Sequence, residues 1–465
     1  MIFSSAIFIF GFLPFFLAVY YLAPRRAKSW VILLGSYAFY GWWRVDYLAV
    51  VFGISLISYL AAQVALYGAT ERRRIWALRL GVTSVLLVLG YFKYTMFILG
   101  GLGDLSQAIG GVGITMPQII LPIGISFHAF QSISYIVDVS REDAPPARNI
   151  VDFLAFGSLF PQLIAGPVLR YKDLADQFRT RKHSVEIFAN GIARFAQGLA
   201  MKVLIADNVA PLADRLFALS NPTAAEAWLA AGAYSIQLLF DFAGYSAMAI
   251  GLGLMMGFRF VENFDAPYTS QSITEFWRRW HISLSQWLRD YLYVPLGGNR
   301  RGTLRTYVNL MLTMVLGGLW HGANWTFILW GAWHGGWLAV ERMFGAKGTK
   351  SVWPKSIAWP ATMLIVMIGW VMFRAQDVAQ AIAIYRGMLG LHGIALSEEN
   401  SWQIQNTEIT ALLLGFALSL CGATLVSMTA HSPAVARRFG AALLMSCACT
   451  ALIAQTHSPF LYFQF

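Results

Sequence analysis

The run from Trp76 to Leu102 reads WALRLGVTSVLLVLGYFKYTMFILGGL, and Arg79 and Lys93 are its only charged residues. This run is long enough to cross the hydrocarbon core of a bilayer, which takes about 20 apolar residues in a helix. Backbone polar groups in lipid need partners within their own segment, and the run lacks the alternation of a membrane strand. It therefore predicts a transmembrane helix.

The rest of the chain repeats this pattern. Its 465 residues are 57% hydrophobic and 12% charged, with a mean hydropathy of +0.57, which excludes an ordinary soluble protein. We expect an all-α, polytopic integral membrane protein with roughly 11–13 membrane helices, including short or re-entrant ones, in a single domain over residues 1–465. The candidate spans are roughly 6–22, 30–43, 46–67, 76–100, 118–137, 150–168, 186–206, 226–257, 306–342, 357–373, 408–428 and 438–457.

The charges indicate orientation. The formal net charge is +11, but the basic residues lie in short clusters between apolar runs, so no nucleic-acid partner is expected. Positive loops mark the cytoplasmic side. If the first span leads inward, the clusters at 24–28 and 71–74 are both cytoplasmic and both chain ends are external. The three cysteines lack any ligand spacing, so neither a metal site nor a bound cofactor is expected.

Ionisable side chains at membrane depth are costly, so each is a functional candidate. They are Lys93, His128, Asp241, His321, His334 and Arg374. His321 follows paired glycines in LGGLWHGANW, which allow a local break and a cavity where a neutral imidazole acts as a general base. Thirteen residues separate His321 from His334, about 20 Å along an unbroken helix, so both act on one bond only if the chain turns. A structural, hydrogen-bonded role is the alternative for each histidine.

The segment Thr274–Tyr291 predicts one helix with an apolar aromatic face. That face carries Phe276, Trp280, Leu284, Trp287 and Tyr291, and the opposite face carries Arg278, His281, Ser285 and Arg289. With the loop that follows, we expect a cytoplasmic interfacial element over residues 274–305. Its basic face suits the phosphates of a nucleotide or a lipid headgroup. An ordinary interfacial helix with a satisfied histidine has the same pattern.

Eight motifs carry a resemblance to the membrane-bound O-acyltransferase (MBOAT) family, and to its members that O-acetylate alginate and other exopolysaccharides. The motifs are MIFSS at 1–5, AFYGWWR at 38–44, PQLIAGPVLRY at 161–171, DFAGYS at 241–246, FWRRWHIS at 276–283, LYVPLGGN at 292–299, LWHG at 319–322 and FLYFQF at 460–465. Together they cover nearly the whole length.

The resemblance implies an MBOAT fold and an acetyltransferase in the bacterial cytoplasmic (inner) membrane. Such an enzyme takes an acetyl group from cytoplasmic acetyl-CoA and passes it across the bilayer for O-acetylation of an extracytoplasmic polysaccharide. The expected partner is an SGNH-type extracytoplasmic acetyltransferase. His321 is implied as the catalytic residue and His281 as its essential partner.

Further residues follow from the chemistry of acyl transfer, which needs donors for the developing oxyanion. Asn324, Trp320 and Trp325 are the candidates near His321, and Arg278, Arg279 and Arg289 are the candidates for the CoA phosphates. The tail 458–465 is expected to be an external aromatic segment. There Tyr462 is a candidate acyl relay, and an interfacial anchor is the alternative.

Other functions stay open at this stage. Peptidoglycan or another cell-wall polymer is an alternative acceptor. A proton-coupled transporter or flippase is a second class, which inverted repeats would favour, and the sequence shows none by eye. A scaffold that only recruits an external enzyme is a third.

Overall fold

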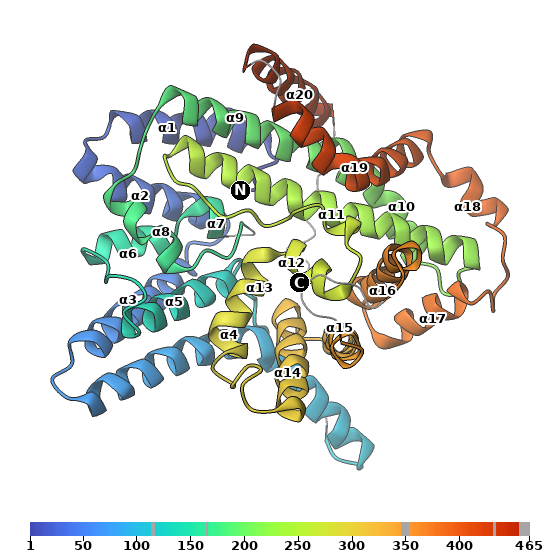
Figure 1. The fold of residues 1–465 in the computed structure, drawn as a ribbon, viewed down its shortest axis with the longest axis horizontal. Coiled ribbons are helices and arrows are strands. Elements are labelled where there is room, and N and C mark those ends of the chain that lie inside the picture. Colours follow the sequence, from blue (N-terminus) through green and yellow to red (C-terminus); the bar gives the residue numbers. More distant parts are fainter. Residues whose placement is uncertain (113–116, 164–165, 346–352, 431–433, 455–465) are drawn as a thin grey trace. The chain divides into compact units, whose positions relative to one another are not determined.

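The computed structural model describes residues 1–112, 117–163, 166–345, 353–430 and 434–454. The secondary-structure elements in these ranges are helices, which confirms the all-α prediction (Figure 1). The chain divides into two compact units. Unit 1 holds residues 1–191 and 252–261, and unit 2 holds residues 192–251 and 262–465. That the two units work as one membrane domain stays a prediction.

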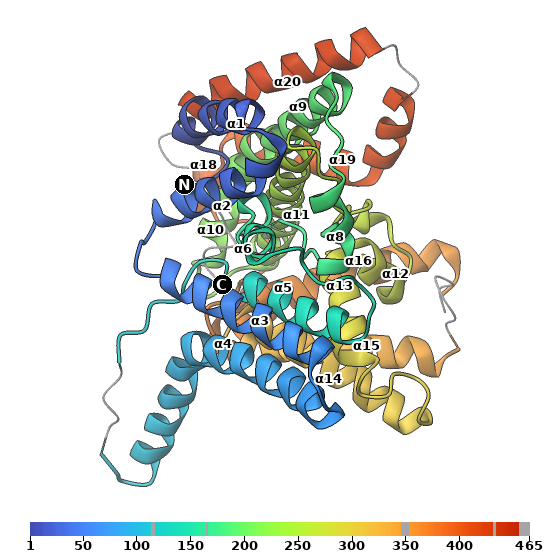
Figure 2. The ribbon, with the colours of Figure 1, turned by 90° about the vertical axis from the view of Figure 1, so that its left-hand side faces the viewer.

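Unit 1 is built from the N-terminal helices. They are a π-helical turn at Ile7–Phe12 that continues into α1 (Leu13–Leu22), then α2 (Lys28–Gly41), α3 (Leu48–Tyr67), α4 (Glu71–Ala108), α5 (Ile125–Ser140), α6 (Ile150–Gly157), α7 (Phe160–Leu163) and α8 (Tyr171–Arg179). Helix α3 packs along α4 and α5 (Figure 2). Helix α4 begins at a cap in which the Thr70 side chain accepts a hydrogen bond from the Arg73 amide.

His128 ties three helices of unit 1 together. Its imidazole is fully buried on α5, with Nδ1 2.9 Å from the Gly157 carbonyl of α6 and Nε2 3.1 Å from the Val51 carbonyl of α3. Ser55 Oγ lies 3.1 Å from the same Nε2. Because both ring nitrogens are occupied by structural partners, this buried histidine stabilises the packing of the three helices.

Unit 2 contains the remaining helices. Helix α9 (Val185–Ala200) enters it, followed by a π-helical turn at Met201–Ala206, α10 (Asp207–Phe217), α11 (Ala224–Met255), α12 (Ile273–Arg279), α13 (Ile282–Leu288), α14 (Thr303–His321), α15 (Trp325–Met343), α16 (Lys355–Arg374), α17 (Val378–Met388), α18 (Glu398–Gln403), α19 (Asn406–Ala430) and α20 (Ala434–Ala454). A π-helical turn at Arg289–Tyr293 follows α13.

Helix α11 runs through the core of unit 2 rather than facing lipid. In its most apolar window 89% of the residues are buried, against 11% in α20. Small residues make this possible, because a side chain at Gly198 of α9 would come within 2.4 Å of the Gly244 carbonyl of α11. The two helices therefore cross with their backbones nearly touching.

Five of the described helices are long and apolar enough to cross a membrane. They are Leu48–Tyr67, Glu71–Ala108, Ala224–Met255, Ser356–Arg374 and Val435–Ala454, with shorter apolar helices at Ile7–Leu22 and Asn406–Cys421. These confirm a multi-pass membrane protein with short helices among long ones.

The span expected over 306–342 consists of two helices. Helix α14 ends at His321, Gly322 is extended, and α15 begins after Asn324, whose side chain accepts from the Thr326 amide at 3.1 Å. The side chain of Asn324 therefore starts a new helix where the glycine ends the old one. The chain turns between His321 and His334, and α14 and α15 pack against each other.

The single helix expected over Thr274–Tyr291 is wrong. Helix α12 stops at Arg279, Trp280 is extended, and His281 takes a left-handed conformation with φ 46° and ψ 53° before α13 begins. The segment 263–265 pairs with both sides of this break. The Asp265 amide donates to the Arg279 carbonyl, and the Ile282 amide donates to the Asn263 carbonyl, each at 3.0 Å. Tertiary hydrogen bonds thus replace helical ones.

Candidate functional site

The break between α12 and α13 turns His281 into the core of unit 2. The sequence prediction that His281 lies on the basic outer face is therefore wrong, because its side chain is 0% exposed. The imidazole meets the Phe242 ring of α11 edge to face, with ring centres 4.7 Å apart. Its centre is 6.4 Å from that of His321.

Asn263 fixes the protonation of the His281 ring. Asn263 Oδ1 accepts from the Ser283 amide at 3.2 Å and from Ser283 Oγ at 2.8 Å, and it lies 3.2 Å from His281 Nδ1. A backbone amide only donates, so the Asn263 atom at this point is the oxygen and His281 Nδ1 carries the hydrogen. His281 Nε2 is then the basic nitrogen, and it has no hydrogen-bond partner among the described residues.

Burial keeps this imidazole neutral. Desolvation lowers the pKa of His281 to about 3, so the ring stays uncharged throughout the physiological pH range. A neutral imidazole with a fixed tautomer can accept a proton at Nε2. The left-handed backbone of His281 costs about 1–3 kcal/mol, and such strain concentrates at functional sites.

His321 lies at the end of α14 inside an aromatic cage. It is 6% exposed, and its ring centre lies 5.0 Å from Trp320, 5.2 Å from Trp330 and 5.1 Å from Phe373. The structure thus brings His321 and His281 into one cluster, with Trp320 beside both, since Trp320 is 6.3 Å from His281.

His334 enters the same cluster through Trp330. It is fully buried on α15, with ring centres 5.2 Å from Trp330 and 5.3 Å from Trp277. Neither of its ring nitrogens has a hydrogen-bond partner within the described ranges. Since Trp330 contacts both His321 and His334, the turn after α14 places two distant sequence positions on either side of one indole.

The other expected oxyanion donors are placed differently. Asn324 uses its oxygen to cap α15 and donates through Nδ2 to the Gln376 carbonyl at 2.7 Å. Trp325 is 61% exposed at the start of α15. Of the three candidates, Trp320 alone contacts the histidine rings in the described part of the chain.

The three expected donor-binding arginines differ in their partners. Arg279 Nη2 lies 2.9 Å from Glu275 Oε1, and Arg289 Nε lies 2.7 Å from Asp290 Oδ1. Arg278 is exposed on α12 and makes no ion pair with any residue that the structure describes. Arg278 is therefore the least committed of the three. Tyr462 and the tail 458–465 lie outside the described residues.

Two features near His281 were not recognised in the sequence. Asn263 lies in a loop with no motif to mark it, and only the folded contact reveals its role. Lys202 forms a buried cluster with Asp207 and Asp241, and its Nζ is 2.8 Å from Asp241 Oδ1. Asp241 is among the ionisable residues that the sequence places at membrane depth, and its neighbour Phe242 is the ring that packs on His281. The ion cluster therefore anchors the stretch of α11 that faces the imidazole.

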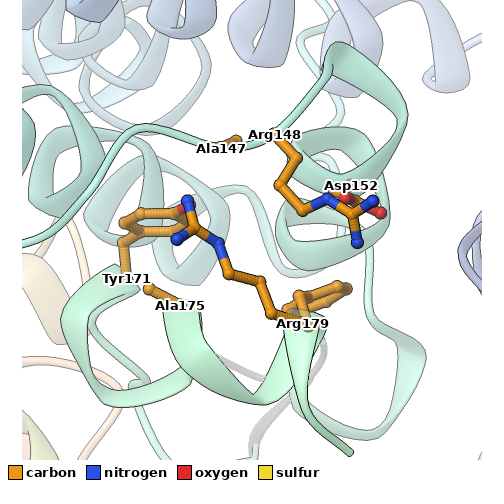
Figure 3. A pocket seen from close by; sticks show the side chains of 7 residues that line it. Ala147, Arg148, Asp152, Tyr171, Ala175 and Arg179 are labelled. Atoms are coloured by element: carbon orange, nitrogen blue, oxygen red, sulfur yellow. The ribbon is translucent and has the colours of Figure 1, made fainter.

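Unit 1 holds a separate small hollow. It is lined by Ala147, Arg148, Asp152, Tyr171, Ala175, Phe178 and Arg179. Figure 3 shows the Arg179 side chain reaching over Tyr171, while Arg148 extends towards Asp152 from the opposite side. Two guanidinium groups suit an anion, but the lining holds no histidine, cysteine or serine for acyl transfer. Within the described ranges no three metal-binding side chains converge, and the expectation that no metal takes part stays a prediction.

The helical fold and the buried histidine cluster define a multi-pass membrane protein with a site suited to proton transfer inside a helix bundle. Residues 139–379 match the model of the membrane-bound O-acyltransferase family. The chain belongs to the MBOAT family, which confirms the resemblance and identifies an O-acyltransferase.

Relatives agree over the whole length. The chain is 48% identical to a probable alginate O-acetylase of Azotobacter vinelandii and 50% identical to one of Pseudomonas putida, with 100% of both chains covered in each comparison. It is 36% identical to the peptidoglycan O-acetyltransferase of Helicobacter pylori, covering 85% of this chain and 81% of that protein.

Proposed function

We propose that this protein takes an acetyl group from acetyl-CoA at the cytoplasmic face of a bacterial inner membrane and passes it across for O-acetylation of extracytoplasmic alginate. The observation that carries the proposal is the similarity of 48% over both full lengths to a probable alginate O-acetylase. The relative named for peptidoglycan is less similar, at 36%, which makes that polymer the second candidate acceptor.

The histidine cluster supplies the proton chemistry that this reaction needs. A hydroxyl oxygen attacks the thioester carbonyl carbon while a histidine nitrogen takes the hydroxyl proton. The carbon–sulfur bond then breaks, and the thiolate leaves and takes a proton from the imidazolium. His321 is the proposed base, and His281 is its partner.

The spacing of the two rings supports a shared substrate position. Their centres are 6.4 Å apart, so the nitrogens do not bond to each other directly, and one hydroxyl oxygen can lie between them. His281 Nε2 is held as an acceptor by Asn263, and it can hand a proton on without a change of tautomer at Nδ1.

The donor and the partner complete the proposal. Arg278, Arg279 and Arg289 are the proposed contacts of the CoA phosphates on the cytoplasmic side. An SGNH-type acetyltransferase receives the acetyl group outside, and Tyr462 is the proposed relay. Acyl chemistry favours an enzyme over a transporter or a passive scaffold, because family membership implies an acyl donor.

The test is label transfer by the purified full chain in proteoliposomes, with radiolabelled acetyl-CoA outside and alginate with the SGNH-type enzyme inside. We expect label on alginate, its loss in His321→Ala, and a melting temperature within a few degrees of wild type for that variant. Replacing alginate with peptidoglycan fragments tests the second acceptor. Retention of more than a tenth of the rate in His321→Ala would refute the role of His321, and a wild-type protein that releases no CoA from acetyl-CoA would refute the proposal.

A further inference from the structure

One face of α15 carries a row of buried polar groups. Thr326, Trp330 and His334 follow one another at intervals of four residues, so they share that face. Thr326 Oγ1, Trp330 Nε1 and both nitrogens of His334 are shielded from solvent and have no hydrogen-bond partner among the described residues. Buried polar groups are nearly always satisfied, so a row of unsatisfied ones indicates a position that something else occupies.

A second indole faces the middle of this row. Trp277 of α12 has its ring centre 5.6 Å from Trp330 and 5.3 Å from His334, and its Nε1 is also shielded and unpartnered within the described ranges. Trp277, Trp330 and His334 therefore form a triangle of mutually contacting rings. Trp330 is only 1% exposed, whereas Trp277 is partly exposed, so the triangle reaches from the core towards the surface of unit 2.

The chemistry of the two indoles defines which group they can bind. An indole N–H only donates, so two adjacent ones need an acceptor. Leaving a buried donor unsatisfied is costly, yet a group that gains negative charge during a reaction repays that cost. The carbonyl oxygen of an acyl thioester is such a group, and the His321 ring centre lies 5.2 Å from that of Trp330.

We propose that Trp330 and Trp277 donate their indole N–H groups to the carbonyl oxygen of the acyl donor, and so stabilise the oxyanion that forms when the hydroxyl attacks. This assignment rests on the acyl transfer proposed above. The two indoles take the place of Asn324 and Trp325 as oxyanion donors. The side-chain amide of Asn324 caps α15 and bonds to Gln376, and Trp325 is exposed. No bond to either indole forms or breaks, and the proton moves between the hydroxyl, a histidine and the leaving thiol as before.

Trp330→Phe tests the proposal because it deletes the N–H and keeps an aromatic ring. Removing one oxyanion donor typically lowers kcat by about 100-fold or more. We expect this loss of kcat in Trp330→Phe, with a KM near that of wild type. In Trp277→Phe we also expect a lower kcat. Trp370→Phe is the matched control, because Trp370 is buried in the same aromatic cluster but its Nε1 already donates to Tyr268 Oη at 3.1 Å. The control should lower the melting temperature while kcat stays within about threefold.

A spectroscopic measurement makes the test independent of turnover. In the His321→Ala background, bound acetyl-CoA carrying a 13C carbonyl should show a C=O stretch below that of the free thioester, and adding Trp330→Phe should return the stretch towards the free value. A lowered stretch, together with a wild-type protein that transfers no acetyl group, would uphold these donors and refute only the proposed function. An unshifted stretch, or a Trp330→Phe enzyme with kcat within twofold of wild type, means that the triangle holds only water and overturns the inference.

Discussion

Asn263→Asp probes the tautomer of His281 without deleting its acceptor. The carboxylate can still accept from the Ser283 amide and from Ser283 Oγ, which lie 3.2 Å and 2.8 Å from Oδ1. It also places a negative charge 3.2 Å from His281 Nδ1, where an amide oxygen lay before. An opposite charge at this distance raises a histidine pKa by about one to three units.

The expected result is a shift of the pH–rate profile. In the wild type the pKa of His281 is about 3, so its Nε2 remains a free base well below neutrality. In Asn263→Asp the imidazolium is favoured, so protonation removes the acceptor nitrogen of His281, the proposed partner of His321, at a higher pH. The acid limb of kcat/KM should therefore move towards neutrality by about one to three pH units.

Two further variants separate chemistry from stability. Asn263→Ala removes the oxygen that accepts from Ser283 and lies beside His281 Nδ1, and losing a buried hydrogen-bond partner costs about 1–3 kcal/mol, so the melting temperature should fall. Asn309→Asp is the matched control, because Asn309 is equally buried but donates to the Gly298 carbonyl at 2.9 Å, away from the histidines. Label transfer measured from pH 4 to pH 8 decides the matter. We expect an acid limb within this range for Asn263→Asp and none for wild type, and a variant profile as flat as that of wild type would refute the fixed tautomer of His281.

Three other outcomes follow from the same contacts. His281→Gln should make stability less dependent on acid pH. In wild type the folded His281 has a pKa of about 3 and the unfolded one a pKa near 6.5, so the protein loses stability as the pH falls from 6.5 to 3. Thermal melting at pH 7 and pH 4 checks this, and equal slopes contradict it. Lys202→Met removes the buried cation that Asp207 and Asp241 share, so the free energy of unfolding should fall by about 3–5 kcal/mol in denaturant titrations. A loss under 1 kcal/mol refutes the anchoring role of the cluster. Arg278→Ala should raise the acetyl-CoA Kd about tenfold in calorimetry, with Arg289→Ala as the weaker, already paired comparison, and equal affinities argue against a CoA-phosphate role for Arg278.

Hydrophobic patterning predicted much of the fold because the bilayer leaves few choices. The apolar runs predicted α3, α11 and α16 closely and the middle of the longer α4, since a segment in lipid must form a helix. The apolar face read along 274–291 also predicted burial correctly for Phe276, Trp280, Leu284 and Trp287. Periodicity records which side chains are buried, and it reports nothing about whether the backbone between them is continuous.

The errors at the site arise from contacts that are distant in sequence. The helix break at Trp280 depends on Asn263 and Asp265, and no local signal in the segment 274–291 records that pairing. For the same reason His281 was assigned to the outer face. The turn after His321 was foreseeable, because Gly322 followed by Asn324 is a helix stop and a helix cap in sequence. Partners of individual side chains, such as those of Trp330, require the packed structure.

The left-handed backbone at His281 sets stability against activity at a single position. Ala266, which directly follows the segment 263–265 that pairs with the break, is also left-handed, with φ 40°. Both paired segments therefore contain a backbone conformation that an L residue adopts at a cost. Substitutions that let α12 and α13 merge into one helix would relieve this strain and would move the His281 ring away from its place beside His321. Selection for heat resistance alone should therefore accumulate substitutions around His281 and Ala266 and yield a more stable membrane protein without acyl-transfer activity.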